Sequence, residues 1–189
     1  MLRNLVIAAA LVAAPAFAGA AEWTVDPAHS TASFTVKHMM VSTVRGEMHK
    51  LTGSVSWSKP DYSDAHADVT IDPATIDTGD GERDDHLRSP DFFDVGKFPT
   101  LTFKSKRVDK SKSAGHVVLV GDLTIHGVTK EVAFDVTLPA GAQKSYRAEA
   151  KINRRDFGLT WNRAIETGGV MVSDEVALDI TLALTTKSR

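Results

Sequence analysis

The feature that most constrains the fold of this chain is a strict alternation of apolar and polar residues within positions 121–138. The apolar positions are Leu123 and Ile125 before a central break, and Val132, Phe134, Val136 and Leu138 after it. A period of two places these side chains on one face of a pleated strand. The break, His126-Gly127, permits a tight reversal, so the stretch predicts a β-hairpin. Because an isolated hairpin is marginally stable in water, its apolar face must cover a packed core or a cavity.

Most of the remaining chain repeats this pattern. Apolar and polar residues alternate in stretches at about 23–25, 32–38, 44–57, 65–71, 101–105, 117–125, 146–152 and 176–184. About eight strands predict an all-β fold, either an antiparallel barrel or a sandwich. Periodicity does not choose between them, because each strand has one apolar face in both.

One region has the features of a helix. Its first turn begins with the acidic Glu82 and its last turn ends with Arg88, the order that the helix dipole favours. Ser89 and Pro90 then offer an N-cap and a first helical position for a second start. The sequence therefore predicts a short helical insert over about residues 82–95.

The sequence leaves open whether the interior is hollow. A barrel of about eight strands can enclose one small ligand. Several residues expected to face inward are small, namely Ala32, Ala65, Ala67, Ala148 and Ala150. Small residues leave space unless large side chains such as Phe34, Phe103 and Trp57 fill it from the opposite wall, in which case the interior is a packed core.

Residues 1–20 have the features of a cleaved signal peptide. Arg3 gives a positive start, a short apolar run covers residues 5–12, and small residues at 16–20 suit a signal peptidase. A retained anchor would need about 20 apolar residues. We therefore expect cleavage between 18 and 21, and one exported domain over residues 21–189.

Charge and cysteine content narrow the class of protein further. The chain has 22 Lys and Arg residues against 24 Asp and Glu residues, so it lacks the basic balance expected of a nucleic-acid-binding protein. It has no Cys. The sequence thus excludes a disulfide framework, a thiolate site and a lipid-modified cysteine anchor.

Four stretches together resemble one family. They are WTVDPAHSTASFTVKH at 23–38, SPDFFDVGKFPT at 89–100, GDLTIHGVTK at 121–130 and RDFGLTW at 155–161. Each stretch is weak by itself, but four in this order are specific, and the resemblance runs from about Trp23 to Leu184. On these residues the chain is similar to the YceI-like family of periplasmic polyisoprenoid-binding proteins.

The resemblance implies a lipocalin-like antiparallel β-barrel that encloses a long isoprenoid chain in an apolar lumen. Members of the family bind polyprenyl or quinone-like lipids, often as dimers, and no catalytic activity is established for the family. We therefore expect a periplasmic protein, not an enzyme, that transports or stores such a lipid and has no other cofactor. A homodimer and transient contact with a membrane are the further associations expected.

A prenyl tail offers no hydrogen bonds, so its binding depends on apolar area removed from water, at roughly 25 cal/mol per Å² before the cost of association. The candidates for the lumen wall are Phe34, Val36, Phe103, Leu123, Ile125, Phe134, Val136, Leu178 and Ile180. An ordinary packed core would use the same residues, and the pattern alone does not separate the two.

The head group of such a lipid would need polar donors where the lumen opens. The candidates for this mouth are His38, Met39, Met40, Arg155, Trp161, Asn162, Arg163 and Met171. The planar guanidinium of arginine suits a phosphate, and methionine side chains adapt to irregular ligands. The structural alternatives are that Arg155 pairs with Asp156 and that the methionines fill gaps.

Two other classes of function fit the residues less well. Binding of a metal ion or haem by the seven histidines, at positions 29, 38, 49, 66, 86, 116 and 126, is the rival hypothesis, but these show no i, i+4 pair or close cluster. For an enzyme, the chain offers neither a Gly-x-Ser-x-Gly elbow nor a phosphate-binding loop. Asp84 and Asp85 are expected in the solvated first turn of a helix.

Overall fold

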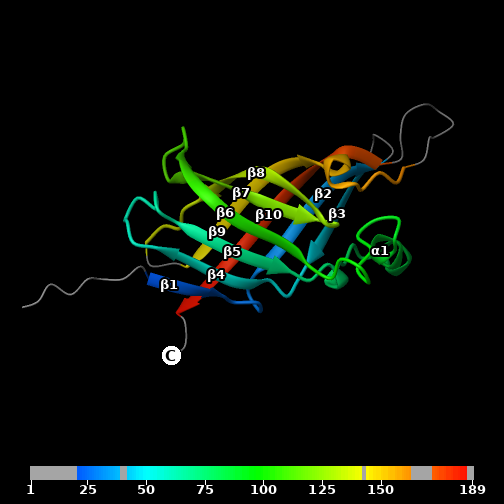
Figure 1. The fold of residues 1–189 in the computed structure, drawn as a ribbon, viewed down its shortest axis with the longest axis horizontal. Coiled ribbons are helices and arrows are strands. Elements are labelled where there is room, and N and C mark those ends of the chain that lie inside the picture. The colour runs from blue at the N-terminus through cyan, green and yellow to red at the C-terminus, as the bar shows by residue number, and fades with distance from the viewer. Residues whose placement is uncertain (1–20, 39–41, 142–143, 163–171, 187–189) are drawn as a thin grey trace, which may run out of the picture.

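The computed structural model of the protein describes residues 21–38, 42–141, 144–162 and 172–186 (Figure 1). The strands in this part of the chain are β1 (Ala21–Val25), β2 (Thr31–His38), β3 (Ser42–Met48), β4 (Thr52–Trp57), β5 (His66–Ile71), β6 (Leu101–Lys110), β7 (His116–Ile125), β8 (Val128–Thr137), β9 (Ser145–Asn153) and β10 (Val172–Thr186). A 3-10 turn, η1 (Pro73–Thr75), and the helix α1 (Gly81–Arg88) lie between β5 and β6, and a second 3-10 turn, η2 (Arg154–Phe157), follows β9. Within these ranges, no helix is long and apolar enough to cross a membrane.

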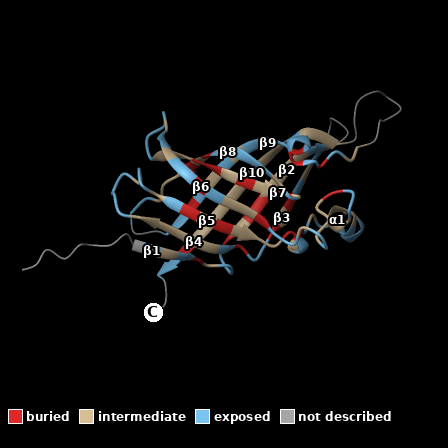
Figure 2. Cartoon of the chain, viewed as in Figure 1, coloured by how far each residue is buried: buried red, intermediate tan, exposed pale blue. Residues whose placement is uncertain are grey.

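Eight of the strands close into an antiparallel barrel. Their order is β1-β4-β5-β6-β7-β8-β9-β10, and β10 pairs back with β1. The β2–β3 hairpin pairs with the other part of the same edge of β10. The closure confirms the predicted lipocalin-like barrel over a sandwich. Buried positions lie along the strands, and exposed ones are common in the connecting loops (Figure 2).

β10 runs along the length of the barrel, so its residues show how far along the barrel their partners in β1, β2 and β9 lie. It begins at Val172, Leu178 near its middle pairs with Phe34, and Leu184 near its end pairs with Val25. The start of β10 lies at the same end of the barrel as α1, and its last residues lie beside β1 at the other end (Figure 1). A position along β10 therefore measures depth inside the barrel.

The predicted β-hairpin is confirmed as β7 and β8. Ile125 pairs with Val128, so the connection is the two residues His126 and Gly127. Both have positive φ, 51° and 74°, which is the conformation of a type I′ turn. The twist of this turn matches that of the strands, and the apolar face of the hairpin is buried as expected.

The helical insert is shorter than predicted. Asp80 caps α1 by accepting a hydrogen bond from the Arg83 N–H, and the helix ends at Arg88. Ser89 does not start a second helix; its N–H and its hydroxyl both donate to the His86 carbonyl oxygen and close the first one. Residues 89–98 form hydrogen-bonded turns instead, because Asp94 has a left-handed φ of 45° that interrupts helical geometry.

The segment that leads from η1 into α1 is bonded to β3. Glu47 and Asp77 exchange backbone hydrogen bonds of 2.8 and 2.9 Å. The expectation of a solvated Asp84 is wrong: this residue is 6% exposed, and its carboxylate accepts from the N–H and the hydroxyl of Thr78. Asp85, one position later, points to solvent. The buried carboxylate therefore ties α1 to the segment before it, and it holds the helix in place against the barrel.

Candidate ligand-binding cavity

The barrel encloses a cavity. The space open to the centre of a water molecule is about 190 Å³, whereas a single water needs only about 10–15 Å³ on the same measure. Side chains from the strands therefore do not meet across the interior as they would in a packed core. The open question from the sequence is answered in favour of a hollow lumen.

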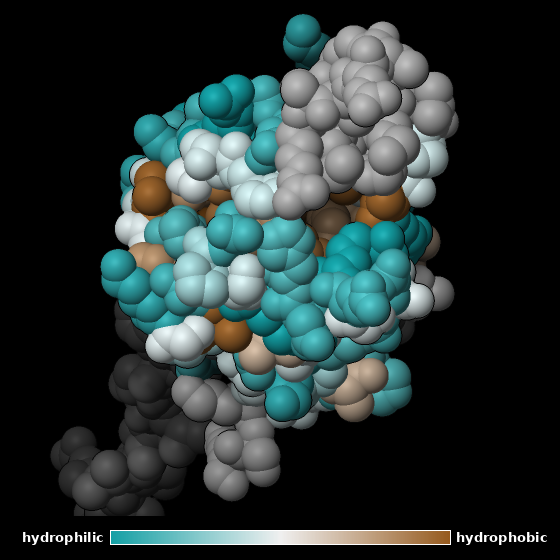
Figure 3. All heavy atoms as spheres, turned by 90° about the vertical axis from the view of Figure 1, so that its right-hand side faces the viewer, coloured by the Kyte–Doolittle hydropathy of each residue, from teal (hydrophilic) through white to brown (hydrophobic). Residues whose placement is uncertain are grey.

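The described wall of this cavity is almost entirely apolar. Its residues are Ala32, Ser33, Phe34, Val36, Met48, Ala67, Val69, Ile71, Leu87, Phe92, Phe93, Leu101, Thr102, Phe103, Leu119, Leu123, Ile125, Phe134, Ala148, Ile152, Arg154, Leu159, Val172, Val176, Leu178, Ile180 and Leu182. Three of the five small residues noted in the sequence, Ala32, Ala67 and Ala148, are among them. Seen from the end nearest α1, the outer surface is mostly hydrophilic with small apolar patches (Figure 3).

Eight of the nine predicted lumen residues lie on this wall. The ninth, Val136, is 8% exposed and belongs to the packed part of the interior. Sequence reasoning missed a group that the insert supplies, Leu87, Phe92 and Phe93. No alternation marks these residues, because they lie in a helix and in turns. Whether the wall residues contact a ligand remains a prediction.

An aromatic cluster lies beyond the deepest part of the cavity, and we call this the aromatic end. It consists of Trp23, Trp57, Tyr62 and Tyr146. The two indoles stack with their ring centres 5.6 Å apart, and the ammonium group of Lys144 lies 4.6 Å from the centre of the Trp23 ring. Tyr146 pairs with Leu182, the last residue of β10 on the cavity wall. The cluster therefore packs across the barrel immediately beyond the cavity.

The hydroxyl groups of the two tyrosines lie close together at this end of the barrel. The Tyr62 and Tyr146 hydroxyls are 3.5 Å apart. Burial raises the pKa of Tyr146 above its ordinary value, and the hydrogen bond between the Tyr146 and Tyr62 hydroxyls adds to the effect. The indole N–H of Trp23 is also buried and has no partner in the described part of the chain. These groups close the end of the barrel by packing more than by polar contact.

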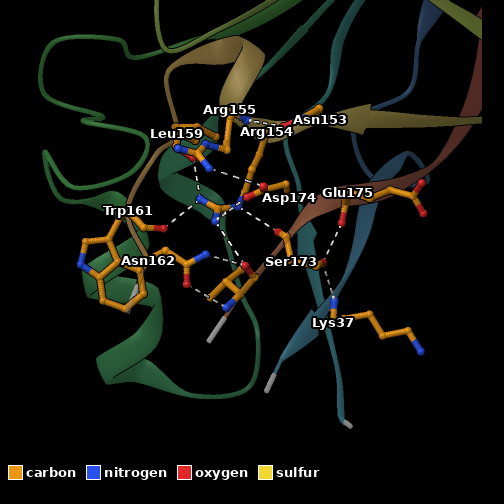
Figure 4. Close-up of polar contacts among 11 residues, drawn as sticks. Lys37, Asn153, Arg154, Arg155, Leu159, Trp161, Asn162, Ser173, Asp174 and Glu175 are labelled. Carbon is orange, nitrogen blue, oxygen red and sulfur yellow. Dashed lines mark hydrogen bonds and ion pairs between the residues drawn. The ribbon is translucent and has the colours of Figure 1, made fainter. Parts of the chain in front are cut away.

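A buried arginine lies at the opposite end, which we call the arginine end. Arg154 is 4% exposed, and it is the one charged side chain among the described residues of the wall. Its five N–H groups donate to the carbonyl oxygens of Leu159, Trp161, Val172 and Ser173 and to the carboxylate of Asp174, over 2.5–3.3 Å (Figure 4). Burial lowers the pKa of Arg154, while Asp174 opposes that shift.

This guanidinium is a clamp within the protein. It joins the segment after η2 to the first residues of β10, and all five of its donors are used. A buried charge is tolerated when hydrogen bonds surround it in this way. Arg154 therefore shapes the arginine end but has no donor left for the head group of a ligand.

The predicted mouth residue Arg155 lies away from the cavity wall. Its side chain is 58% exposed, and its guanidinium is 3.6 Å from the carboxylate of Asp174. Sequence reasoning had considered Asp156 as its partner. The N–H of Arg155 donates to the side chain of Asn153, which caps η2. The sequence pointed to the right segment, but the arginine on the cavity wall is the preceding one.

Of the other predicted mouth residues, Trp161 and Asn162 lie beside the arginine end, and the side chains of the rest lie outside the described part of the structure. Trp161 packs its ring against His86 and Phe92, with centres 4.9 and 5.2 Å apart. Asn162 donates to the carbonyl of Val172 and accepts from its N–H. Neither residue is on the described wall. His38 ends β2, but its side chain lies outside the described part of the structure, as do Met39, Met40, Arg163 and Met171.

The histidines do not converge in the described structure. His29, His86 and His116 each pair with a different carboxylate, those of Asp26, Asp91 and Asp135. His66 is 3.1 Å from the Ser105 hydroxyl, and His126 packs on Phe98. Within the described ranges, no group of three or more His, Asp or Glu side chains could hold a metal ion.

A closed eight-stranded antiparallel barrel with an apolar lumen defines a protein of the lipocalin-like class. The sequence profile of the YceI-like domain matches residues 23–184, and the chain belongs to this family. A UPF0312 protein of Staphylococcus aureus strain MSSA476 is 38% identical over 165 residues, which are 83% of this chain and 93% of that protein.

Solved structures agree with this assignment. Burkholderia cenocepacia BcnA superimposes with a TM-score of 0.74 at 28% identity, over 86% of this chain and 99% of BcnA. A Campylobacter jejuni YceI protein gives a TM-score of 0.65 at 27% identity, over 81% and 90%. A polyisoprenoid-binding domain from Saccharophagus degradans gives 0.64 at 17% identity, over 87% and 98%, and shares the fold.

Proposed function

We propose that the protein is a binding protein that holds an isoprenoid-like lipid, with its tail in the lumen of the barrel. The observation that carries the proposal is a cavity whose described wall is apolar apart from Ser33, Thr102 and the fully bonded Arg154. Burial of hydrocarbon against such a wall is favourable by roughly 25 cal/mol for each Å² of apolar surface removed from water. The same wall penalises a polar group that enters without a partner.

The relationships of the chain support the choice of lipid. It belongs to the YceI-like family, and a protein with the same fold is described as a polyisoprenoid-binding domain. With a cleaved signal peptide at residues 1–20, the protein would transport or store its lipid in the periplasm. Transient contact with a membrane during transfer, and a homodimer, belong to the same proposal.

The proposal is tested on protein secreted from the full-length sequence and purified without detergent. Native mass spectrometry should show the protein with an added mass, which organic extraction removes and which chromatography with mass detection identifies as an isoprenoid lipid. Protein that carries no lipid, or that carries stoichiometric metal or haem instead, would contradict it.

A matched pair of variants links that lipid to the lumen. Ile125 and Thr124 are adjacent in β7 and point to opposite faces of the sheet. Ile125→Lys brings a charge into the apolar lumen and should abolish lipid retention, as should Phe134→Asp. Thr124→Lys adds the same charge to the outer face and should retain lipid as the wild type does. If folded Ile125→Lys and Phe134→Asp still hold lipid normally, these residues do not line the site.

A further inference from the structure

An aromatic ring lies on the cavity wall at half its depth. Phe34 in β2 pairs on one side with Leu178, midway along β10, and on the other side with Gly46 in β3. The wall continues on both sides of this level. Val36 lies two residues nearer the arginine end, and Ala32 two residues nearer the aromatic end. A ligand that fills the lumen must pass Phe34.

Gly46 provides the space in which the Phe34 ring lies. A Cβ atom added to Gly46 would be 2.3 Å from Cζ and 2.5 Å from Cε1 of Phe34, distances at which the atoms overlap. The ring therefore occupies the volume that a side chain at position 46 would take. Because of this recess in β3, the ring lies against the wall and leaves the lumen open.

The remaining neighbour of this recess is fixed. The added Cβ atom would also be 2.8 Å from Cγ2 of Thr78. Thr78 donates to the buried carboxylate of Asp84 through its N–H at 2.9 Å and its hydroxyl at 2.6 Å, and it accepts from Nε of Arg83 at 2.8 Å. Its carbonyl oxygen accepts a fourth hydrogen bond from the Arg83 guanidinium at 3.0 Å. A residue held by four hydrogen bonds does not yield easily, so the Phe34 ring must move, and the open space is on its lumen side.

We infer that Gly46 determines how long a lipid the barrel accepts, by holding the Phe34 ring out of the lumen. The inference rests on the proposed function and names its specificity determinant. Gly46 is a positioning residue that acts through Phe34, since it is not itself on the described wall. With a side chain at position 46, the ring crosses the lumen and separates the half at the arginine end from the half at the aromatic end.

A second glycine shows why position 46 is the one to test. An added Cβ atom at Gly121 would be 2.7 Å from the ring of Phe103, but also 2.4 Å from the Lys104 carbonyl oxygen and 2.7 Å from Cα of Ser105. A methyl group there would distort the backbone at the bulge between β6 and β7. At Gly46 the close atoms belong to side chains, so the barrel can remain folded.

The experiment uses delipidated protein and three isoprenoid alcohols of increasing length: farnesol, geranylgeraniol and solanesol. Dissociation constants are measured for the wild type, Gly46→Ala, Phe34→Ala and the double variant. Gly46→Ala should bind farnesol as the wild type does and lose solanesol about a hundredfold or more, since each methylene left in water lowers affinity about fourfold. The double variant should bind solanesol again, because the ring that blocks the lumen is gone.

Gly96→Ala is the matched control, because a methyl group at Gly96 meets open space. Unchanged solanesol affinity in folded Gly46→Ala, or no recovery in the double variant, would overturn the inference. If Gly46→Ala does not fold, Phe34→Trp tests the same point, because an indole exceeds the recess; it should also lose solanesol selectively, and wild-type affinity would reject the idea. Wild-type protein that binds none of the three alcohols would instead reject the proposed function.

Discussion

The two ends of the barrel are closed by different kinds of interaction. At the aromatic end, Trp23 and Trp57 stack beside two tyrosines, and one indole N–H there is buried without a partner in the described structure. At the arginine end, the five N–H groups of Arg154 donate hydrogen bonds to four carbonyl groups and one carboxylate. One end is held by apolar contact and the other by hydrogen bonds.

This difference between the two ends favours one orientation of a lipid in the lumen. A hydrocarbon tail loses nothing when it approaches the aromatic end, because packing there needs no polar partner. The arginine end is the polar one, where residues 159–162 meet the start of β10. We therefore expect the tail of a bound lipid to point to the aromatic end and its head group to lie at the arginine end.

The largest effect is expected from breaking the arginine clamp. Arg154→Met keeps an apolar chain of similar length but removes the guanidinium donors of four carbonyl groups and a carboxylate. The Val172 carbonyl keeps the Asn162 amide and Asp174 keeps Arg155, while the other three carbonyl groups lose this partner. Loss of one partner from a buried ionic network costs about 3–5 kcal/mol. Urea unfolding should show a fall of this size in the free energy of unfolding.

Its neighbour is the matched control. Arg155 is exposed and forms one ion pair, so Arg155→Met should change the free energy of unfolding by less than about 1 kcal/mol. Equal losses for the two variants would show that the hydrogen bonds of Arg154 do not hold the arginine end.

A smaller effect is expected from opening the aromatic end. Truncation of a fully buried Trp costs about 3–5 kcal/mol; Trp57 is half-buried, so Trp57→Ala should cost about 2 kcal/mol. The loss of its stack with Trp23 should also speed release of a bound prenol, measured as a dissociation rate. Trp57→Phe keeps a ring in place and should release prenol at nearly the wild-type rate. If Trp57→Ala loses stability but releases prenol no faster, the aromatic end does not retain the tail.

The sequence predicted the lumen wall well because the direction of a side chain in a strand is a local property. Alternation in β2, β6, β7, β8 and β10 identified eight wall residues without any knowledge of tertiary structure. The same alternation rule also predicts that Arg154 faces inward. Ala148, Ala150 and Ile152 face inward, and Arg154 is the next residue in that phase. The family motif drew attention to Arg155 instead.

The hollow interior could not be predicted, because alternation gives the direction of a side chain but not the distance to the opposite wall. That distance depends on strand number, tilt and the way in which large rings are accommodated. Phe34 lies against Gly46, its partner in β3, and Phe103 lies against Gly121, which pairs with Ser105 two residues further along β6. Both contacts depend on the register between neighbouring strands. The contribution of the insert was hidden for another reason: Leu87 reaches the wall from the helix, and Phe92 reaches it from turns that the capping rules did not predict.

The smallest effect distinguishes the two ends by pH. The folded-state pKa of Tyr146 is raised by burial, so its contribution to stability is complete below the ordinary tyrosine pKa of about 10 and is lost as the pH rises toward the folded value. The melting temperature should therefore fall in alkaline solution. Tyr146→Phe should lessen this fall while costing less than about 1 kcal/mol at neutral pH, because the hydroxyl pair that it removes is long. Arg154→Met alters the arginine end and should leave the alkaline slope of the wild type unchanged. If Tyr146→Phe keeps that slope as well, the tyrosine does not titrate against folding, and the aromatic end is wetter than its burial indicates.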